Sequence, residues 1–298
     1  MGLIGVLEGH SSAVYALASN LIDKRVFSGA ADNMVGSWNL EEMKPDSFSV
    51  KLEYSIFSLL FCDEYLLIGQ SAGGVHLIDL NKKRELRHLK FHDLPVFSII
   101  NDENRGFHYF LGGDGKLSIV DHIDFSLKLS LPLSDDKLRC GIVRDDSFEL
   151  FVGSSDGYIR ILETTYFNVI FEVEGHPGGV YDMKWLDDEN LLTVGRDGHI
   201  RRWRFGNGTI THEEAIPAHN YAIYALQFSP SGRKIATCSR DKKVKIWNAS
   251  DLSFDKRIER EGPTGHTHSV NTVMWYDENT LLSAGDDRKI LVWNLKDS

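Results

Sequence analysis

A tryptophan that follows an aspartate at a fixed distance recurs four times in this chain. The segments "SGAADNMVGSWN", "TVGRDGHIRRWR", "TCSRDKKVKIWN" and "SAGDDRKILVWN" each carry an Asp six residues, and a Ser or Thr ten residues, before the last Trp. A His lies 27 or 28 residues before the same Trp in every case. The four sets are His10, Ser28, Asp32, Trp38; His176, Thr193, Asp197, Trp203; His219, Thr237, Asp241, Trp247; and His266, Ser283, Asp287, Trp293. Four matches at three offsets indicate an internal repeat.

Three further copies fit between Trp38 and Trp203. They place Ile78, Val120 and Leu162 in the position of the Trp, so that seven units, spaced 40 to 46 residues apart, account for essentially all 298 residues. The third unit keeps His92 and Asp114, the fourth keeps only Asp156, and the second keeps no member of the set. Units two to four are therefore degenerate.

Each unit is predicted to consist of β-strands. A β-branched or aromatic first segment such as Val180-Tyr181-Asp182 is followed by an apolar run, a tight turn with Asp, Gly or Asn, and the alternating Trp strand. A helix of ordinary length with a 3.6-residue period is not found. These observations predict an all-β fold.

Short strands that repeat every 40 to 46 residues, with Gly-His near the start and a terminal Trp, resemble the WD-repeat β-propeller family. The residue after the Trp is Asn or Arg here, where the family has Asp. The resemblance covers the whole chain and implies a single domain, residues 1–298, forming a seven-bladed propeller of four-stranded antiparallel blades. In this family the His, Ser or Thr, Asp and Trp form a hydrogen-bonded tetrad within each blade.

The last unit lacks sequence for a fourth strand, because only residues 295–298 follow Trp293. The segment Leu3 to Leu7 has strand character and no unit of its own before it. We therefore expect it to pair with the strand from Lys289 to Trp293, complete the last blade and close the ring, which removes an exposed sheet edge.

Catalytic and metal-binding interpretations of the motifs are disfavoured. A Ser, His and Asp set also describes a hydrolase triad, but here it occurs four times, half the copies carry Thr, and the Trp occupies the hydroxyl. The segment "GSSDG" from Gly153 to Gly157 matches a nucleophile elbow, but a strand-like segment follows it where that motif needs a helix. His266 belongs to a tetrad, which leaves His268 and Asp286 too few for a metal site. We expect no catalytic residue, no metal and no cofactor.

Composition narrows the partners and the compartment. The net charge of −10 argues against nucleic acid, whose phosphates favour a basic surface. No apolar run reaches the length of about 18 residues that a membrane helix needs. Cys62, Cys140 and Cys238 are far apart and odd in number, so we expect reduced thiols and a cytoplasmic protein.

The expected function is a non-catalytic scaffold that binds a protein or peptide, as a monomer or as a subunit of a larger complex. The family resemblance places binding on the face that carries the inter-blade loops and the Asp turns. The candidate residues on this face are Glu53, Asp93, Asp135, Lys137, Arg196, Asn220, Tyr221, Arg240, His268 and Asp286. The alternative is a propeller enzyme or small-molecule binder that uses the central channel. Aromatic residues at one first-strand position of five units (Tyr15, Phe57, Phe97, Tyr181, Tyr224) are expected to pack between blades.

Overall fold

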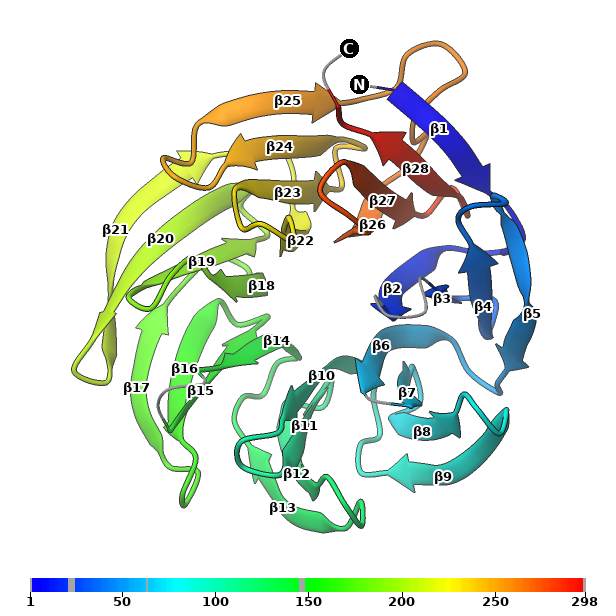
Figure 1. Ribbon diagram of the computed structural model, residues 1–298. Coiled ribbons are helices and arrows are strands. Elements are labelled where there is room, and N and C mark those ends of the chain that lie inside the picture. The colour runs from blue at the N-terminus through cyan, green and yellow to red at the C-terminus, as the bar shows by residue number, and fades with distance from the viewer. Residues whose placement is uncertain (1, 21–24, 63, 145–147, 297–298) are drawn as a thin grey trace. The chain divides into compact units, whose positions relative to one another are not determined.

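The computed structural model describes residues 2–20, 25–62, 64–144 and 148–296, and over these residues the chain is built from β-strands and turns without a helix. It therefore contains, in the part described, no helix that is long and apolar enough to cross a membrane. The strands form seven four-stranded sheets, or blades, labelled in Figure 1. The chain divides into two compact units, residues 1–61 with 219–298 and residues 62–218, which are described separately.

The first unit contains blades 1, 6 and 7. Blade 1 has the strands β2 (Val14–Asn20), β3 (Arg25–Ala30), β4 (Met34–Asn39) and β5 (Lys44–Lys51). Blade 6 has β22 (Ile223–Phe228), β23 (Lys234–Ser239), β24 (Val244–Asn248) and β25 (Phe254–Ile258). Blade 7 has β26 (Val270–Trp275), β27 (Thr280–Gly285), β28 (Ile290–Asn294) and, as its fourth strand, β1 (Gly2–Leu7).

The second unit contains blades 3, 4 and 5 and most of blade 2. Blade 2 has β6 (Ile56–Cys62), β7 (Tyr65–Gln70), β8 (Gly74–Asp79) and β9 (Arg84–Lys90). Blade 3 has β10 (Val96–Asp102), β11 (Phe107–Gly112), β12 (Lys116–Asp121) and β13 (Leu127–Pro132). Blade 4 has β14 (Leu138–Val143), β15 (Glu149–Ser154), β16 (Tyr158–Glu163) and β17 (Val169–Glu174). Blade 5 has β18 (Val180–Trp185), β19 (Asn190–Gly195), β20 (His199–Gly206) and β21 (Thr209–Pro217).

The N-terminal strand completes the last blade. β1 lies antiparallel against β28, with Leu3 opposite Trp293 and Leu7 opposite Ile290 (Figure 1). Leu7 is buried, with 2% of its surface exposed, so the strand contributes to the core as well as covering the edge of β28. The predicted fold class, seven four-stranded antiparallel blades with the last one completed by the N-terminal strand, is confirmed.

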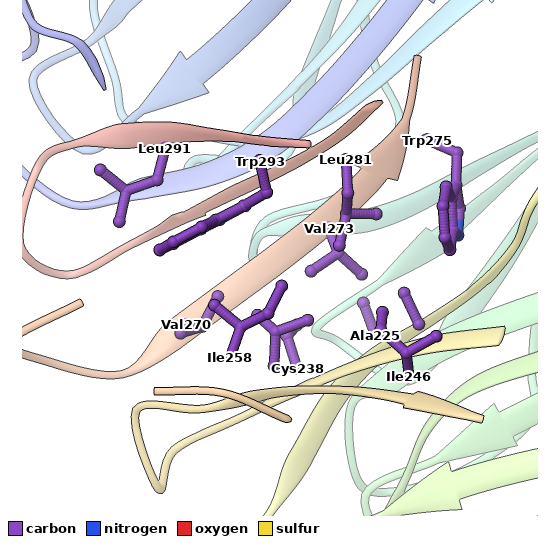
Figure 2. Packing of buried hydrophobic residues seen from close by; sticks show 12 residues of the cluster. Ala225, Cys238, Ile246, Ile258, Val270, Val273, Trp275, Leu281, Leu291 and Trp293 are labelled. Atoms are coloured by element: carbon purple, nitrogen blue, oxygen red, sulfur yellow. The ribbon is translucent and has the colours of Figure 1, made fainter. Parts of the chain in front are cut away.

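Apolar side chains fill the space between blades 6 and 7 of the first unit. In Figure 2, Trp293, Leu291 and Val273 from blade 7 point toward residues of blade 6. The blade 6 residues labelled there are Ala225, Cys238, Ile246 and Ile258. Burying a large apolar side chain stabilises a fold by about 1.5–3 kcal/mol. This layer therefore holds the two blades together. The packing does not depend on the residue that follows the Trp, which is Asn or Arg here where the family has Asp.

The turn after the second strand of each blade requires a left-handed residue directly after the position of the tetrad Asp. Its φ lies between +68° and +97° in all seven blades, at Asn33, Gly73, Gly115, Gly157, Gly198, Lys242 and Arg288. Glycine adopts this conformation without steric cost, whereas a residue with a Cβ is strained there. The "GSSDG" segment ends on this turn glycine, and the strand β16 begins at the next residue. A strand at this place supports the turn interpretation over the nucleophile elbow.

Candidate interaction surface

A chain of hydrogen bonds runs through the tetrads of blades 1, 5, 6 and 7. The Trp indole N–H donates to the Ser or Thr hydroxyl over 2.7 to 2.9 Å. The His Nε2 lies 2.7 to 2.9 Å from the same hydroxyl. The His Nδ1 lies 2.8 to 3.0 Å from the Asp carboxylate. Both ring nitrogens of every tetrad His are thus hydrogen-bonded. Each tetrad joins the loop before the first strand of its blade to the turn before the third strand.

In blades 5 and 6, electrostatics favour a neutral His and an ionised Asp. Burial lowers the pKa of His219 below its usual value, although Asp241 acts in the opposite direction. Burial alone would raise the pKa of Asp197, but hydrogen bonds from His176 and Arg201 hold it well below the usual range. With a neutral imidazole, the hydroxyl donates to Nε2 and Nδ1–H donates to the carboxylate. The tetrad hydroxyl therefore has its proton and a lone pair engaged in structural hydrogen bonds.

The degenerate blade 3 keeps half of the tetrad. His92 Nδ1 lies 2.9 Å from Asp114, so the loop and the turn are still joined. Phe110 takes the hydroxyl position, and the buried Nε2 of His92 has no hydrogen-bond partner among the residues that the structure describes. Leaving a buried polar atom unpaired costs about 1–3 kcal/mol.

Blade 4 replaces the tetrad with a different network that the sequence reasoning missed. Ser134 stands in the position of the His and donates to Asp156 over 2.6 Å. Arg160 lies 2.8 Å from the same carboxylate oxygen of Asp156, and Ser154 donates to the other oxygen. Burial raises the pKa of Asp156, but the hydrogen bonds from Arg160, Ser134 and Ser154 outweigh it and lower the pKa to about 2. The replacement therefore keeps the acid ionised.

Blade 2 uses positions equivalent to those of blade 4. His76 hydrogen-bonds Gln70 over 2.6 Å and Glu85 over 2.7 Å, and its ring stacks on that of His88 at 4.2 Å. Gln70 and Ser154 both lie eight residues before the Trp position, and His76 and Arg160 both lie two residues before it. The polar residues at these two offsets were the feature of the sequence from which both networks could have been predicted.

Backbone hydrogen bonds place one residue of each Asp turn beside the entry loop of its own blade. In six blades the residue directly before the Asp position donates its N–H to a loop carbonyl over 2.7 to 3.0 Å. The donors are Ala31, Gly113, Ser155, Arg196, Arg240 and Asp286, and the acceptors are Ala13, Pro95, Lys137, Gly179, Ala222 and Ser269. The loops and turns predicted to carry the binding residues therefore lie together within each of these blades.

In the first unit, the structure brings some of the predicted binding residues together. Tyr221 is 58% exposed, and the Arg240 guanidinium lies 6.0 Å from the centre of its ring. Asp286 accepts a hydrogen bond from Asn271 over 2.8 Å. The remaining predicted residues, Glu53, Asn220 and His268, are exposed on the entry loops of blades 2, 6 and 7.

In the second unit, the predicted binding residues are exposed on separate blades. Asp93 lies in the loop before β10, Asp135 and Lys137 lie before β14, and Arg196 lies in the Asp turn of blade 5. The stem of Arg196 passes over Gly178, where an added Cβ would lie 2.8 Å from its Cδ. The missing side chain of Gly178 thus gives the arginine a place to lie flat.

Four of the five aromatic first-strand residues contact the same position of another blade in their own unit. Tyr15 and Phe57 stack with their rings 4.8 Å apart. Arg139 fills the same position in blade 4, with its guanidinium 4.2 Å from the Phe97 ring and 4.9 Å from the Tyr181 ring. The sequence analysis counted only aromatic residues there and missed Arg139, although a cation between two rings is favourable.

Most of the basic residues late in the chain are paired. Arg201 lies 2.7 Å from Asp197, Arg204 lies 2.9 Å from Glu189, and Lys243 lies 3.0 Å from Glu259. Arg196 and Arg240 form no ion pair with any residue in the described part of the chain. Two uncompensated cations therefore occupy equivalent turn positions in blades 5 and 6.

The comparisons with known proteins find similarity to repeat proteins. A family model described as "WD domain, G-beta repeat" matches residues 1–39, 167–204, 210–248 and 260–294, just over half of the chain. These segments contain the four complete tetrads.

Three curated proteins represent the relatives. A "Ribosome biogenesis protein WDR12 homolog" of Nematostella vectensis is 26% identical over 258 residues, covering 76% of this chain and 58% of the relative. "Actin-interacting protein 1" of Caenorhabditis elegans is 23% identical over 313 residues, covering 97% and 48%. A "WD repeat-containing protein 55 homolog" of Aedes aegypti is 23% identical over 272 residues, covering 88% and 58%. The chain thus spans about half the length of these relatives.

Proposed function

Since the chain belongs to the WD40 repeat family, we propose that it is a non-catalytic scaffold that binds a protein or peptide. Binding takes place on the surface formed by the Asp turns and the entry loops, which we call the Asp-turn face. The names of the relatives point to different assemblies, such as ribosome biogenesis and actin interaction. They support an interaction role in a larger complex, and they do not select a partner.

The observation that carries the proposal is the pair of uncompensated arginines in the Asp turns of blades 5 and 6. Arg196 and Arg240 are exposed at equivalent positions, while Asp93 and Asp135 are exposed in the loops of blades 3 and 4. Complementary charges orient a partner and speed its association. We therefore expect acidic groups of the partner beside Arg196 in the second unit and beside Arg240 in the first.

The experiment is an affinity pull-down with crosslinking that compares the native protein with the double variant Arg196→Glu, Arg240→Glu. Because the change reverses two exposed cations that have no ion pair within the described residues, it should leave folding intact and reduce recovery of the partner about tenfold or more. Melting curves from circular dichroism check the folding of each variant.

The matched control is the double variant Lys44→Glu, Arg204→Glu. The side chains of these two residues, one in each unit, are each 61% exposed. Lys44 is the first residue of β5 and Arg204 lies two residues before the end of β20, both away from the Asp turns. The control has the same charge change and should recover the partner as well as the native protein does. Equal recovery by all three proteins would show that the Asp-turn face does not bind this partner.

Further properties remain part of the proposal. The chain acts as a single domain, residues 1–298, binds no nucleic acid, and works in the cytoplasm. Cys62, Cys140 and Cys238 form no disulfide with one another, which supports a reducing compartment. Fluorescence microscopy of a tagged chain tests the location, and a nuclear signal would contradict a cytoplasmic protein. One cooperative unfolding transition, in place of two, tests the single domain.

A further inference from the structure

A hollow of about 420 Å³ lies where blades 2 and 3 meet in the second unit. Its apolar walls include Leu67 and Leu77 from the strands β7 and β8, and Phe125 from the turn after β12. Leu86 and Ile123 stand in the same wall, with 36% and 80% of their surfaces exposed. Pockets of this size and polarity can take up a large apolar group.

The hollow lies at the end of blade 3 away from its Asp turn. Glu103 follows β10, and His122 and Ile123 follow β12, whereas the Asp turn of this blade lies between β11 and β12. None of the residues predicted for the Asp-turn face lines the hollow. A ligand there would occupy a second and separate surface.

The edge strand β9, which supplies Leu86 and Arg87 to the hollow, is strongly basic. The strand and the turn before it carry five cations and one acid, at Lys82, Lys83, Arg84, Arg87, Lys90 and Glu85. Lys82 forms an ion pair with Asp79, and Glu85 is hydrogen-bonded to His76. The side chain of Arg87 forms no hydrogen bond or ion pair with the residues that the structure describes. It therefore places an uncompensated charge on a rim whose walls are apolar.

One polar atom in the hollow also lacks a partner. The side-chain nitrogen of Asn101 donates to Glu103 over 3.0 Å. Its Oδ1 atom is buried and has no hydrogen-bond partner within the described residues. A buried acceptor without a donor is costly, and a backbone N–H from a bound chain would satisfy it.

We propose that this hollow binds an acidic peptide segment of a partner protein, with a large apolar side chain in the hollow and a carboxylate beside Arg87. The apolar walls account for the side chain, the basic edge strand for the acidic flank, and Asn101 Oδ1 for a peptide N–H. RNA would also satisfy the cations and find Phe125 and Arg87 to stack on, but it would leave the aliphatic side chains of the lining, Leu67, Leu77, Leu86 and Ile123, without an apolar partner. An unmatched cation on an edge strand also discourages strand-to-strand aggregation, so the site suits a side-chain ligand more than an added strand.

The experiment selects from a displayed library of random peptides of about 12 residues on the native protein, with counter-selection on the double variant Arg87→Glu, Ile123→Glu. The peptides that the counter-selection removes should combine Leu, Phe, Met or Trp with neighbouring Asp or Glu. A fluorescently labelled synthetic copy of such a peptide is then titrated by anisotropy. We expect Arg87→Glu and Ile123→Glu each to weaken its binding about tenfold or more.

The controls separate this site from the proposed function. Tyr166→Glu changes an equally exposed residue, 78% against 80% for Ile123, outside the hollow and should bind the peptide normally. The Arg196→Glu, Arg240→Glu variant should also bind it normally, so that either surface can fail without the other. A labelled oligouridine RNA of about 12 nucleotides is titrated in parallel.

Three results would overturn the proposal. The first is that no peptide distinguishes the native protein from the double variant. The second is that the distinguishing peptides are basic or lack a large apolar residue. The third is that the oligouridine binds more tightly than the peptide and depends on Arg87. Melting curves of all variants verify that lost binding does not reflect unfolding.

Discussion

At the scale of single residues, the tetrads combine two kinds of stabilisation. Trp247 is buried, with 3% of its surface exposed, and donates to Thr237 over 2.9 Å. Ile78 fills the equivalent position of blade 2 and is equally buried, without a polar partner to lose. The tryptophan therefore contributes both apolar burial and a hydrogen bond, whereas the isoleucine contributes burial alone.

We predict that Trp247→Ala destabilises the protein more than Ile78→Ala does, by at least about 1 kcal/mol, because it also leaves the Thr237 hydroxyl without its donor. Urea unfolding of both variants measures the difference. Trp247→Phe serves as a control that keeps most of the volume and should cost about 1 to 2 kcal/mol. Equal losses for the two alanine variants would argue against a structural role for the tetrad.

The left-handed turn residues give a second prediction. Arg288 is exposed and holds a φ of +68°, where four of the seven blades have glycine. Arg288→Gly relieves the steric cost of the Cβ, and we expect it to raise the free energy of unfolding by up to about 1 kcal/mol. Thermal melting checks the sign. The reverse change Gly157→Ala should destabilise, because the added Cβ would lie 2.6 Å from the carbonyl oxygen of His176.

The pH dependence follows from the depressed pKa values of His176 and His219. The unfolded chain binds a proton near pH 6.5, while the folded chain resists it. The free energy of unfolding should therefore fall as the pH drops from about 7.5, by up to about 1.4 kcal/mol per pH unit for each His. The ionised Asp197, Asp241 and Asp287 extend the loss below about pH 4, because their pKa values are also lowered.

Urea unfolding at several pH values between 5 and 8 tests this dependence, with His219→Gln as the comparison. That variant should be less stable at pH 7 and should show a shallower dependence on pH. Stability that increases on acidification would contradict the assignment of neutral, buried histidines.

The role of a single residue could be predicted from the sequence where that residue recurs at the same position of several repeats. The tetrad residues recur at fixed offsets, so the sequence alone identified all four sets. Ser134 and Arg139 escaped because each occurs once, in a position where most other blades have a His or an aromatic residue. Their roles depend on neighbours in space, namely Asp156 for Ser134 and the rings of Phe97 and Tyr181 for Arg139.

At the scale of the secondary-structure elements, β1 is the strand whose partner lies farthest away in the sequence. Its pairing with β28 was predictable because the last repeat lacked a fourth strand and the first residues had strand character. The strands of the degenerate blades were also predictable, since alternation and turn glycines survive when Ile78, Val120 and Leu162 replace the tryptophan. The substitute networks of blades 2 and 4 were missed, because they share two offsets but not residue types, with Gln70 and His76 in one blade and Ser154 and Arg160 in the other.

Removing residues 1–7 should destabilise the protein strongly, because it uncovers the edge of β28 and the apolar side chains that Leu7 covers. We expect the melting temperature to fall by roughly 5 to 15 °C and the variant to self-associate through the open edge. Within β1, Leu7→Ala should cost about 2 to 4 kcal/mol, whereas Ile4→Ala, at a residue that is 48% exposed, should cost much less. An unchanged melting temperature after the deletion would contradict the closing role of β1.

At the scale of the whole molecule, the sequence predicted the fold class more completely than the binding surfaces. Seven similar repeats leave few alternatives for the fold, whereas a binding surface depends on which exposed charges stay unpaired. Arg204 and Arg196 are both arginines of blade 5. Glu189 forms an ion pair with Arg204, whereas no described residue forms one with Arg196. The hollow between blades 2 and 3 depends on side-chain volumes from segments far apart in the chain, from Leu67 to Phe125.

The central claim is that the chain binds a protein partner through its Asp-turn face. Hydrogen–deuterium exchange of the protein, alone and with the partner recovered by crosslinking, tests it most directly. We predict slower exchange in the entry loops and Asp turns of blades 5 and 6, around residues 176–179, 196–198, 219–222 and 240–243. Protection confined to the opposite strand ends, with these segments unchanged, would contradict the claim.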